Sequence, residues 1–189
     1  MNTQNPQYFT NRAEWRNWLN GNFDKEKETW FVFANKSSGK PTVSYNDAVE
    51  EALCFGWIDS IAKPLDNDHH MQRFTPRRVG SAYSQPNIER LIWLLQQNLV
   101  HPTLVEEMEK IVNKEFVFPA DIMDAIKSDV TAWENYQHFT ESYKRIRVAY
   151  IDGARKRPEE FEKRLNNFIS KTREKKLIIG HGGIDKYYK

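Results

Sequence analysis

WIDSIAKPLDNDHHMQRFT, residues 57–75, is the stretch that decides the fold of the first half of the chain. Its first arm, WIDSIAKPL (57–65), is expected to form a strand, and Pro64 marks an edge or an end because proline cannot donate to a sheet. The second arm, HHMQRFT (69–75), can pair with the first across residues 66–68, an Asp-Asn-Asp run of turn-forming types. The stretch therefore predicts a β-hairpin.

Upstream of this hairpin, the sequence predicts one more strand and two helices. TWFVFA (29–34) is a short aromatic and β-branched run with polar neighbours, which is typical of a buried strand. Asn11 with Glu14, and Ser44 with Asp47, have the spacing of helix N-caps. The N-terminal region is therefore expected to be a small mixed module of about three strands with helices.

After Pro76 the apolar residues follow helical spacing only. Helices are expected after Ser84, Thr103 and Asp121, and across residues 142–157 and 159–172. The fold class is therefore α+β, with an all-helical C-terminal half. We expect an α+β module at 1–83, a helical region at 84–176 packed on it as one cooperative unit, and an exposed, mobile Gly-rich tail at 177–189.

Composition restricts the class of protein. The chain has 189 residues, of which 39% are hydrophobic, so it can bury a core. No apolar run reaches the roughly 18 residues of a membrane-spanning helix, and the N-terminus lacks the apolar stretch of a signal peptide. Cys54 is the single cysteine, which excludes an internal disulfide. We expect a soluble cytoplasmic protein without membrane insertion, and Cys54 buried as a small hydrophobe.

The charges are unevenly distributed. Residues 101–143 carry 3 basic and 9 acidic side chains, whereas residues 144–176 carry 12 basic and 5 acidic ones. Two helical elements that pack on each other would show this pattern, and so would a basic face that binds phosphates. Tyr143 and Tyr150 share the apolar stripe of their helix, so we expect both in the core and do not expect nucleic-acid binding.

Neither a metal nor a cofactor is expected. The histidines lack the spacing of a zinc site; they are His69, His70, His101, His138 and His181. The glycine-rich run 180–183 has no Lys-Ser or Lys-Thr after it, so it does not predict a phosphate loop.

The best candidate ligand site is the arginine-rich stretch RFTPRR (73–78). Arginine forks bind carboxylates and phosphates through two hydrogen bonds, and the helix expected after Ser84 adds oriented amides. The same arginines can also hold loops onto a sheet without any ligand. Asp59 on the neighbouring strand is either a general base or an ion-pair partner of Arg73.

Three stretches carry a resemblance to a known family: EEALCFGWIDS (50–60), RFTPRR (73–78) and SAYSQPN (81–87). They resemble the YdeI/OmpD-associated family, which is also labelled bacteriocin protection. Nearly the whole chain is covered, roughly 9–179, and the C-terminal helices are similar to the closing domain of that family. Glu160-Phe161 and the stretch NLVHP (98–102) depart from the family pattern.

The resemblance implies a link to bacteriocin, antimicrobial-peptide or envelope-stress resistance and, through the family name, to an outer-membrane porin. It transfers no catalytic residues. The first hypothesis is a non-enzymatic protein that binds an unknown protein partner or a small anion. Its candidate surface is Trp57, Asp59, Arg73, Arg77, Tyr83 and Asn87. The alternatives are an enzyme or sensor that holds an anion at the arginine cluster, with Asp59 as the base, and nucleic-acid binding through residues 144–176.

Overall fold

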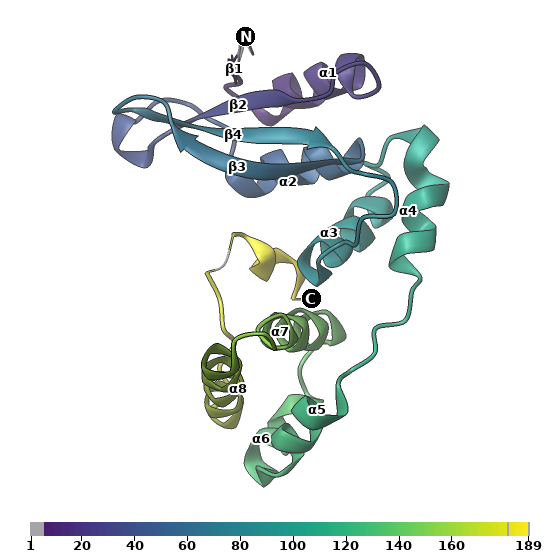
Figure 1. Cartoon of the computed structure of the whole chain (residues 1–189), viewed down its shortest axis with the longest axis vertical. Coiled ribbons are helices and arrows are strands. Elements are labelled where there is room, and N and C mark those ends of the chain that lie inside the picture. Colours follow the sequence, from purple (N-terminus) through teal and green to yellow (C-terminus); the bar gives the residue numbers. More distant parts are fainter. Residues whose placement is uncertain (1–5, 181, 189) are drawn as a thin grey trace. The chain divides into compact units, whose positions relative to one another are not determined.

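The computed structural model of the chain describes residues 6–180 and 182–188, so His181 lies outside the described residues. The chain is α+β, as predicted, with a sheet in the N-terminal half and a mostly helical C-terminal half (Figure 1). The strands are β1 (Pro6–Tyr8), β2 (Thr29–Ala34), β3 (Trp57–Pro64) and β4 (His69–Pro76). The α-helices are α1 (Arg12–Asn22), α2 (Tyr45–Cys54), α3 (Gln85–Gln96), α4 (Val105–Val112), α5 (Ala120–Lys127), α6 (Val130–Gln137), α7 (Glu141–Asp152) and α8 (Pro158–Arg173).

The sheet has the strand order β1-β2-β4-β3. β3 and β4 form the predicted antiparallel hairpin, in which Ile58 lies opposite Thr75 and Asp59 opposite Phe74. β2 runs antiparallel to β4, and the predicted strand 29–34 is confirmed with its bounds. β1 pairs in parallel with β2 and is a fourth strand that the sequence analysis did not predict.

Side chains alternate between the two faces of this sheet, and α1 and α2 cover one of them. Trp15 of α1 contacts the rings of Phe31 and Phe74, and its Nε1 donates to the carbonyl of Ala48 in α2 at 3.0 Å. Trp30, Arg73 and their neighbours belong to the other face, because they alternate with these core residues. The aromatic core around Trp15 therefore lies between the sheet and two helices, and Trp30, Val32 and Met71 form a smaller buried cluster on the other face.

Both predicted N-caps of this region are confirmed. The side chain of Asn11 accepts from the amide of Glu14 at 3.1 Å, and that of Ser44 accepts from the amide of Asp47. Gly56, with φ +71°, adopts the left-handed conformation that ends α2 and leads the chain into β3.

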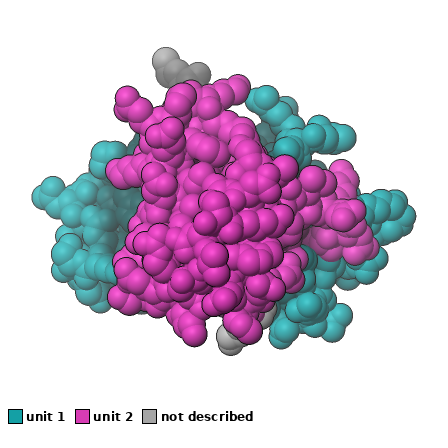
Figure 2. All heavy atoms as spheres, turned by 90° about the horizontal axis from the view of Figure 1, so that it is seen from below, with its two compact units in different colours: residues 1–83, 91–111 teal, residues 84–90, 112–189 magenta. Residues whose placement is uncertain are grey.

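The described chain divides into two compact units, which Figure 2 shows in different colours. The N-terminal unit comprises residues 1–83 and 91–111, and the C-terminal unit comprises 84–90 and 112–189. The chain thus passes from one unit to the other within α3. The predicted bounds 1–83, 84–176 and 177–189 stay a prediction.

Ion pairs in the C-terminal unit join the acidic segment 101–143 to the basic segment 144–176. Asp121 pairs with Arg155 at 2.8 Å, and Asp129 pairs with Arg173. These contacts support the interpretation that the two segments pack on each other. Tyr143 is buried as predicted, but Tyr150 is 46% exposed, so its expected core position is wrong.

The C-terminal segment corrects a further expectation. Ile184, Tyr187 and Tyr188 are buried, so the tail is not exposed at these residues. The hydroxyl of Thr140 donates to the carbonyl of Tyr188 at 3.0 Å, and the ring of Tyr188 contacts Tyr143. Two aromatic residues near the end of the chain supply the apolar surface that holds the segment in place.

Candidate anion-binding site

Four cationic side chains line one pocket of about 480 Å³ in the N-terminal unit. They are Lys27, Arg73, Arg77 and Arg78. The hydroxyl-bearing residues Thr75 and Ser81 line the same pocket. We refer to these six residues as the arginine pocket.

The strand register explains why these residues meet. Arg73 and Thr75 are two positions apart on β4, so they share the face of the sheet that α1 and α2 do not cover. β4 ends at Pro76, and the amide of Arg77 then donates to the carbonyl of Gly56 at 2.9 Å. This hydrogen bond holds Arg77 beside Arg73 and Thr75.

Arg73 is paired within the protein. Its Nε donates to Oε2 of Glu28 at 3.0 Å, and this hydrogen bond lowers the pKa of the Glu28 carboxyl. The expected ion pair between Arg73 and Asp59 is therefore wrong. Asp59 lies on the opposite face of the sheet, where it accepts from the hydroxyl of Tyr45 at 2.8 Å and from Nε2 of Gln72 at 3.2 Å.

Arg77 is held by stacking and by one carbonyl. Its guanidinium carbon lies 3.6 Å from the centroid of the Tyr83 ring, and its Nη2 donates to the carbonyl of Ala82 at 2.7 Å. Burial raises the pKa of Tyr83, so the ring stays neutral beneath the cation. The Nε of Arg77 is buried without a hydrogen-bond partner, and no carboxylate of the described residues forms an ion pair with Arg77. Arg77 is therefore a fixed cation with unused binding capacity.

The structure brings only some of the six predicted site residues together. Arg73 and Arg77 line the arginine pocket, and the ring of Tyr83 stacks on the guanidinium of Arg77. Trp57 is fully buried, and its Nε1 donates to the carbonyl of Phe23 at 3.0 Å. Asn87 belongs to the C-terminal unit, where it accepts from Arg90 at 2.9 Å.

Lys27 is a residue of the arginine pocket that the sequence pattern does not indicate. This lysine precedes β2, and no motif around it indicates a site. It reaches the arginine pocket because β2 pairs with β4 in a register that sets Thr29 opposite Phe74. Only the strand pairing could have revealed it.

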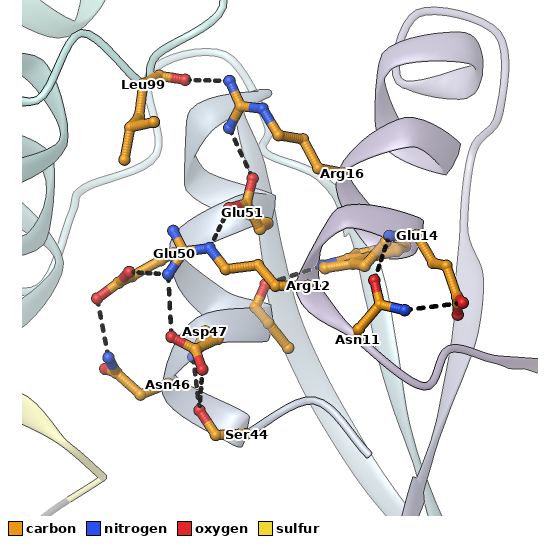
Figure 3. A network of polar contacts seen from close by, with 12 residues as sticks. Asn11, Arg12, Glu14, Arg16, Ser44, Asn46, Asp47, Glu50, Glu51 and Leu99 are labelled. Atoms are coloured by element: carbon orange, nitrogen blue, oxygen red, sulfur yellow. Dashed lines mark hydrogen bonds and ion pairs between the residues drawn. The ribbon is translucent and has the colours of Figure 1, made fainter. Parts of the chain in front are cut away.

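A second charged cluster in this unit joins α1 to α2 (Figure 3). Arg12 bonds to Asp47, Glu50 and Glu51, and Arg16 bonds to Glu51 at 2.7 Å and to the carbonyl of Leu99 at 2.6 Å. Glu50 and Glu51 are buried and each accepts from arginine. Three carboxylates thus surround two arginines, and every charged group of the cluster has a partner of opposite charge within it, which is the arrangement of a structural network.

Cys54 follows this cluster on α2 and is fully buried, as predicted. Burial, followed by the charge of Glu51, raises the pKa of the thiol to about 12. The thiolate is the nucleophilic form of cysteine, and it is not populated here at neutral pH. Cys54 is thus a core residue in its protonated state.

Comparisons with known proteins assign the two parts of the chain to two family models. Residues 115–175 match the model described as "Bacteriocin-protection, YdeI or OmpD-Associated", so the chain contains a domain of this family. Residues 7–107 match a model described as a domain of unknown function (DUF8412). Because this second match spans more than half of the 189 residues, the protein belongs to the DUF8412 family.

The resemblance found in the sequence is confirmed for residues 115–175. The stretches that first suggested it, within residues 50–87, lie instead in the range of the domain of unknown function. No curated protein and no solved structure matches the chain. Within residues 6–180 and 182–188, no helix has the length and apolar composition needed to cross a membrane.

Proposed function

We propose that the protein is a non-enzymatic binding protein that holds a small anionic ligand in the arginine pocket. The observation that carries this proposal is the excess of positive charge there. Four cations line the pocket, and the one carboxylate paired with any of them, among the described residues, is Glu28 on Arg73. An anion would complete the coordination of Arg77 and its neighbours.

The ligand class follows from size and chemistry. A pocket of about 480 Å³ falls in the range of roughly 300–1,000 Å³ that small molecules occupy. Arginine guanidinium groups favour planar carboxylates and phosphates, and the hydroxyls of Thr75 and Ser81 can donate to the same oxygens. We infer a small phosphorylated or carboxylated molecule.

The positions of Asp59 and Arg73 favour binding over catalysis. A base must reach the substrate that the arginines hold, and Asp59 lies on the other face of the sheet with its carboxylate engaged by Tyr45 and Gln72. The basic segment 144–176 offers less support for nucleic-acid binding, because several of its cations pair with carboxylates of the protein.

The physiological role that we propose follows the description of the matched C-terminal family. We propose that ligand binding serves bacteriocin, antimicrobial-peptide or envelope-stress resistance from the cytoplasm, through a protein partner and without direct contact with a porin. In cells, Arg77→Ala should weaken the resistance phenotype at unchanged protein level. An unchanged phenotype would contradict this role.

A thermal-shift screen tests ligand binding directly. The full chain is screened against nucleotides, phosphosugars, carboxylates and cationic peptides. A ligand at 100 times its dissociation constant should stabilise the native state by about 2.7 kcal/mol. We expect an anion to raise the melting temperature of the wild type and to lose this effect in Arg77→Ala.

Two further variants make the screen specific. Arg78→Ala removes an exposed cation of the arginine pocket and should weaken the effect, whereas Arg157→Ala removes an exposed arginine of the C-terminal unit and should not. A ligand whose effect survives both Arg77→Ala and Arg78→Ala would place the binding site elsewhere.

A further inference from the structure

We propose that the C-terminal unit contains a separate site for a small organic oxyanion, anchored by Arg147. A cavity of about 240 Å³ lies there, lined by residues of α7, α8 and the segment that follows α8. Arg147 lines this cavity and is only 3% exposed. The proposal does not depend on the arginine pocket.

Arg147 is a buried cation without a carboxylate partner in the described part of the chain. Its Nη2 donates to the carbonyl of Ile178 and to the hydroxyl of Tyr188, while its Nε is buried with no partner. Neutral oxygens satisfy hydrogen bonds but do not neutralise the charge. A buried charge is costly unless an opposite charge accompanies it, so an anion in this cavity would lower that cost.

The exposed part of the cavity lining adds a positive charge, and its one acidic residue is already paired with an arginine. Lys163 and Asn167 are exposed, line the cavity and lie one turn apart on α8. Glu160, which also lines it, bonds to Arg164 at 2.7 Å. Arg164 is in turn held 3.7 Å above the ring of Tyr150. Glu160 is therefore committed to Arg164, and Arg147 and Lys163 set the charge that a ligand meets.

Part of the cavity wall is apolar, which restricts the class of ligand that fits. Ile151, Phe168 and Ile178 line it. Its volume lies below the roughly 300–1,000 Å³ of pockets for drug-sized molecules. The site therefore fits a short aliphatic chain or a single ring that carries one carboxylate or phosphate.

The probes are butyrate, butyl phosphate and the neutral isostere butanol. Each is titrated into the full chain, and NMR follows the methyl groups of Ile151 and Ile178 and the Nε–H of Arg147. We expect saturable shifts with at least one anion, about 10-fold tighter than with butanol. The tighter anion distinguishes a carboxylate ligand from a phosphate ligand. Absence of saturation with both anions, or equal affinity for butanol, would overturn the proposal.

Matched variants separate a site from general electrostatic attraction. Lys163→Gln removes a cation at the mouth and should weaken anion binding several-fold, whereas Lys171→Gln removes the same charge from α8 outside the cavity lining. Arg147→Gln should abolish binding. If Arg147→Gln fails to fold, the comparison of Lys163→Gln with Lys171→Gln decides, and equal effects of those two would contradict the proposal.

Discussion

Glu51 is a buried carboxylate of the N-terminal unit that depends on two arginines for its hydrogen bonds. Its side chain is 2% exposed, and its two carboxylate oxygens accept from Arg12 and Arg16 of the adjacent helix. The position favours a charged hydrogen-bond acceptor, because the guanidinium groups of Arg12 and Arg16 both bond to it (Figure 3). The sequence shows Glu51 only as one acid on an amphipathic helix.

Glu51→Gln should therefore destabilise the protein by about 2–3 kcal/mol, since the partly buried Arg16 loses the carboxylate it pairs with and Arg12 keeps only Asp47 and Glu50. Arg12 and Arg16 keep about a third of their side chains exposed, which sets the effect below that of a fully buried pair. Urea unfolding measures the change. Glu106→Gln, which breaks an exposed pair with Lys110, is the control and should cost less than about 0.5 kcal/mol. Similar costs for both variants would contradict this account.

Residue identity alone could not assign the partners in the arginine pocket. Asp59 is closer to Arg73 in sequence than Glu28 is, yet Glu28 is its partner. The alternation of side chains along β3 and β4 sends Asp59 to the helix-covered face and Arg73 to the other face. The register shift between Asp59 and Ala62 was not visible in the sequence.

Among the elements, α1 contains asparagine at one position that stabilises the helix and at another that destabilises it. Asn11 is its N-cap and accepts from the amide of Glu14, while the side chain of Glu14 bonds back to Thr10. Asn17 lies exposed in the middle of the same helix. Capping favours asparagine, whereas a helix interior favours alanine.

Asn11→Ala should thus cost about 1 kcal/mol, because an amide at the start of the helix loses its acceptor. Asn17→Ala should stabilise the protein by about 0.5 kcal/mol through helix propensity. Thermal or urea unfolding of the two variants and the wild type shows whether each substitution raises or lowers the free energy of unfolding. If Asn11→Ala leaves the stability unchanged or raises it, Asn11 does not stabilise the start of α1 as a cap.

Most elements could be predicted, and the exceptions have physical reasons. Capping residues and apolar spacing indicated α1, α2 and α3, and turn residues indicated the hairpin of β3 and β4. β1 was missed because three residues carry no periodicity, so its strand character comes from pairing with β2. The glycines of the last segment predict an exposed tail, but Tyr187 and Tyr188 are buried.

At the scale of the whole molecule, each unit contains a thiol or a phenol that binds its proton more tightly in the folded protein than in the unfolded chain. Burial raises the pKa of Cys54 to about 12 in one unit and that of Tyr188 to about 12 in the other. Burial also raises the pKa of Tyr143. In the unfolded chain a thiol loses its proton near pH 8.5 and a phenol near pH 10, so above these values the native state binds more protons than the unfolded state.

As the pH rises from 7, these groups should leave stability unchanged up to about pH 8 and lower it progressively between about pH 9 and 12, by up to about 1.4 kcal/mol per pH unit for each such group. Melting temperatures across this range give the slope, and absorbance at 295 nm reports tyrosinate. Some of the eight tyrosines should ionise only with unfolding. Complete ionisation near pH 10 in a protein that keeps its native circular dichroism would contradict the prediction.

The sequence by itself determined the fold class, the hairpin, most helices and the arginine-rich stretch, because these depend on periodicity and on residues near in the chain. Tertiary structure decided which charges meet. It sent Asp59 to another face than Arg73, brought Lys27 to the arginine pocket and buried Arg147 beneath the C-terminal segment. These contacts join residues far apart in the chain, and strand register and helix packing, which no local pattern encodes, select them.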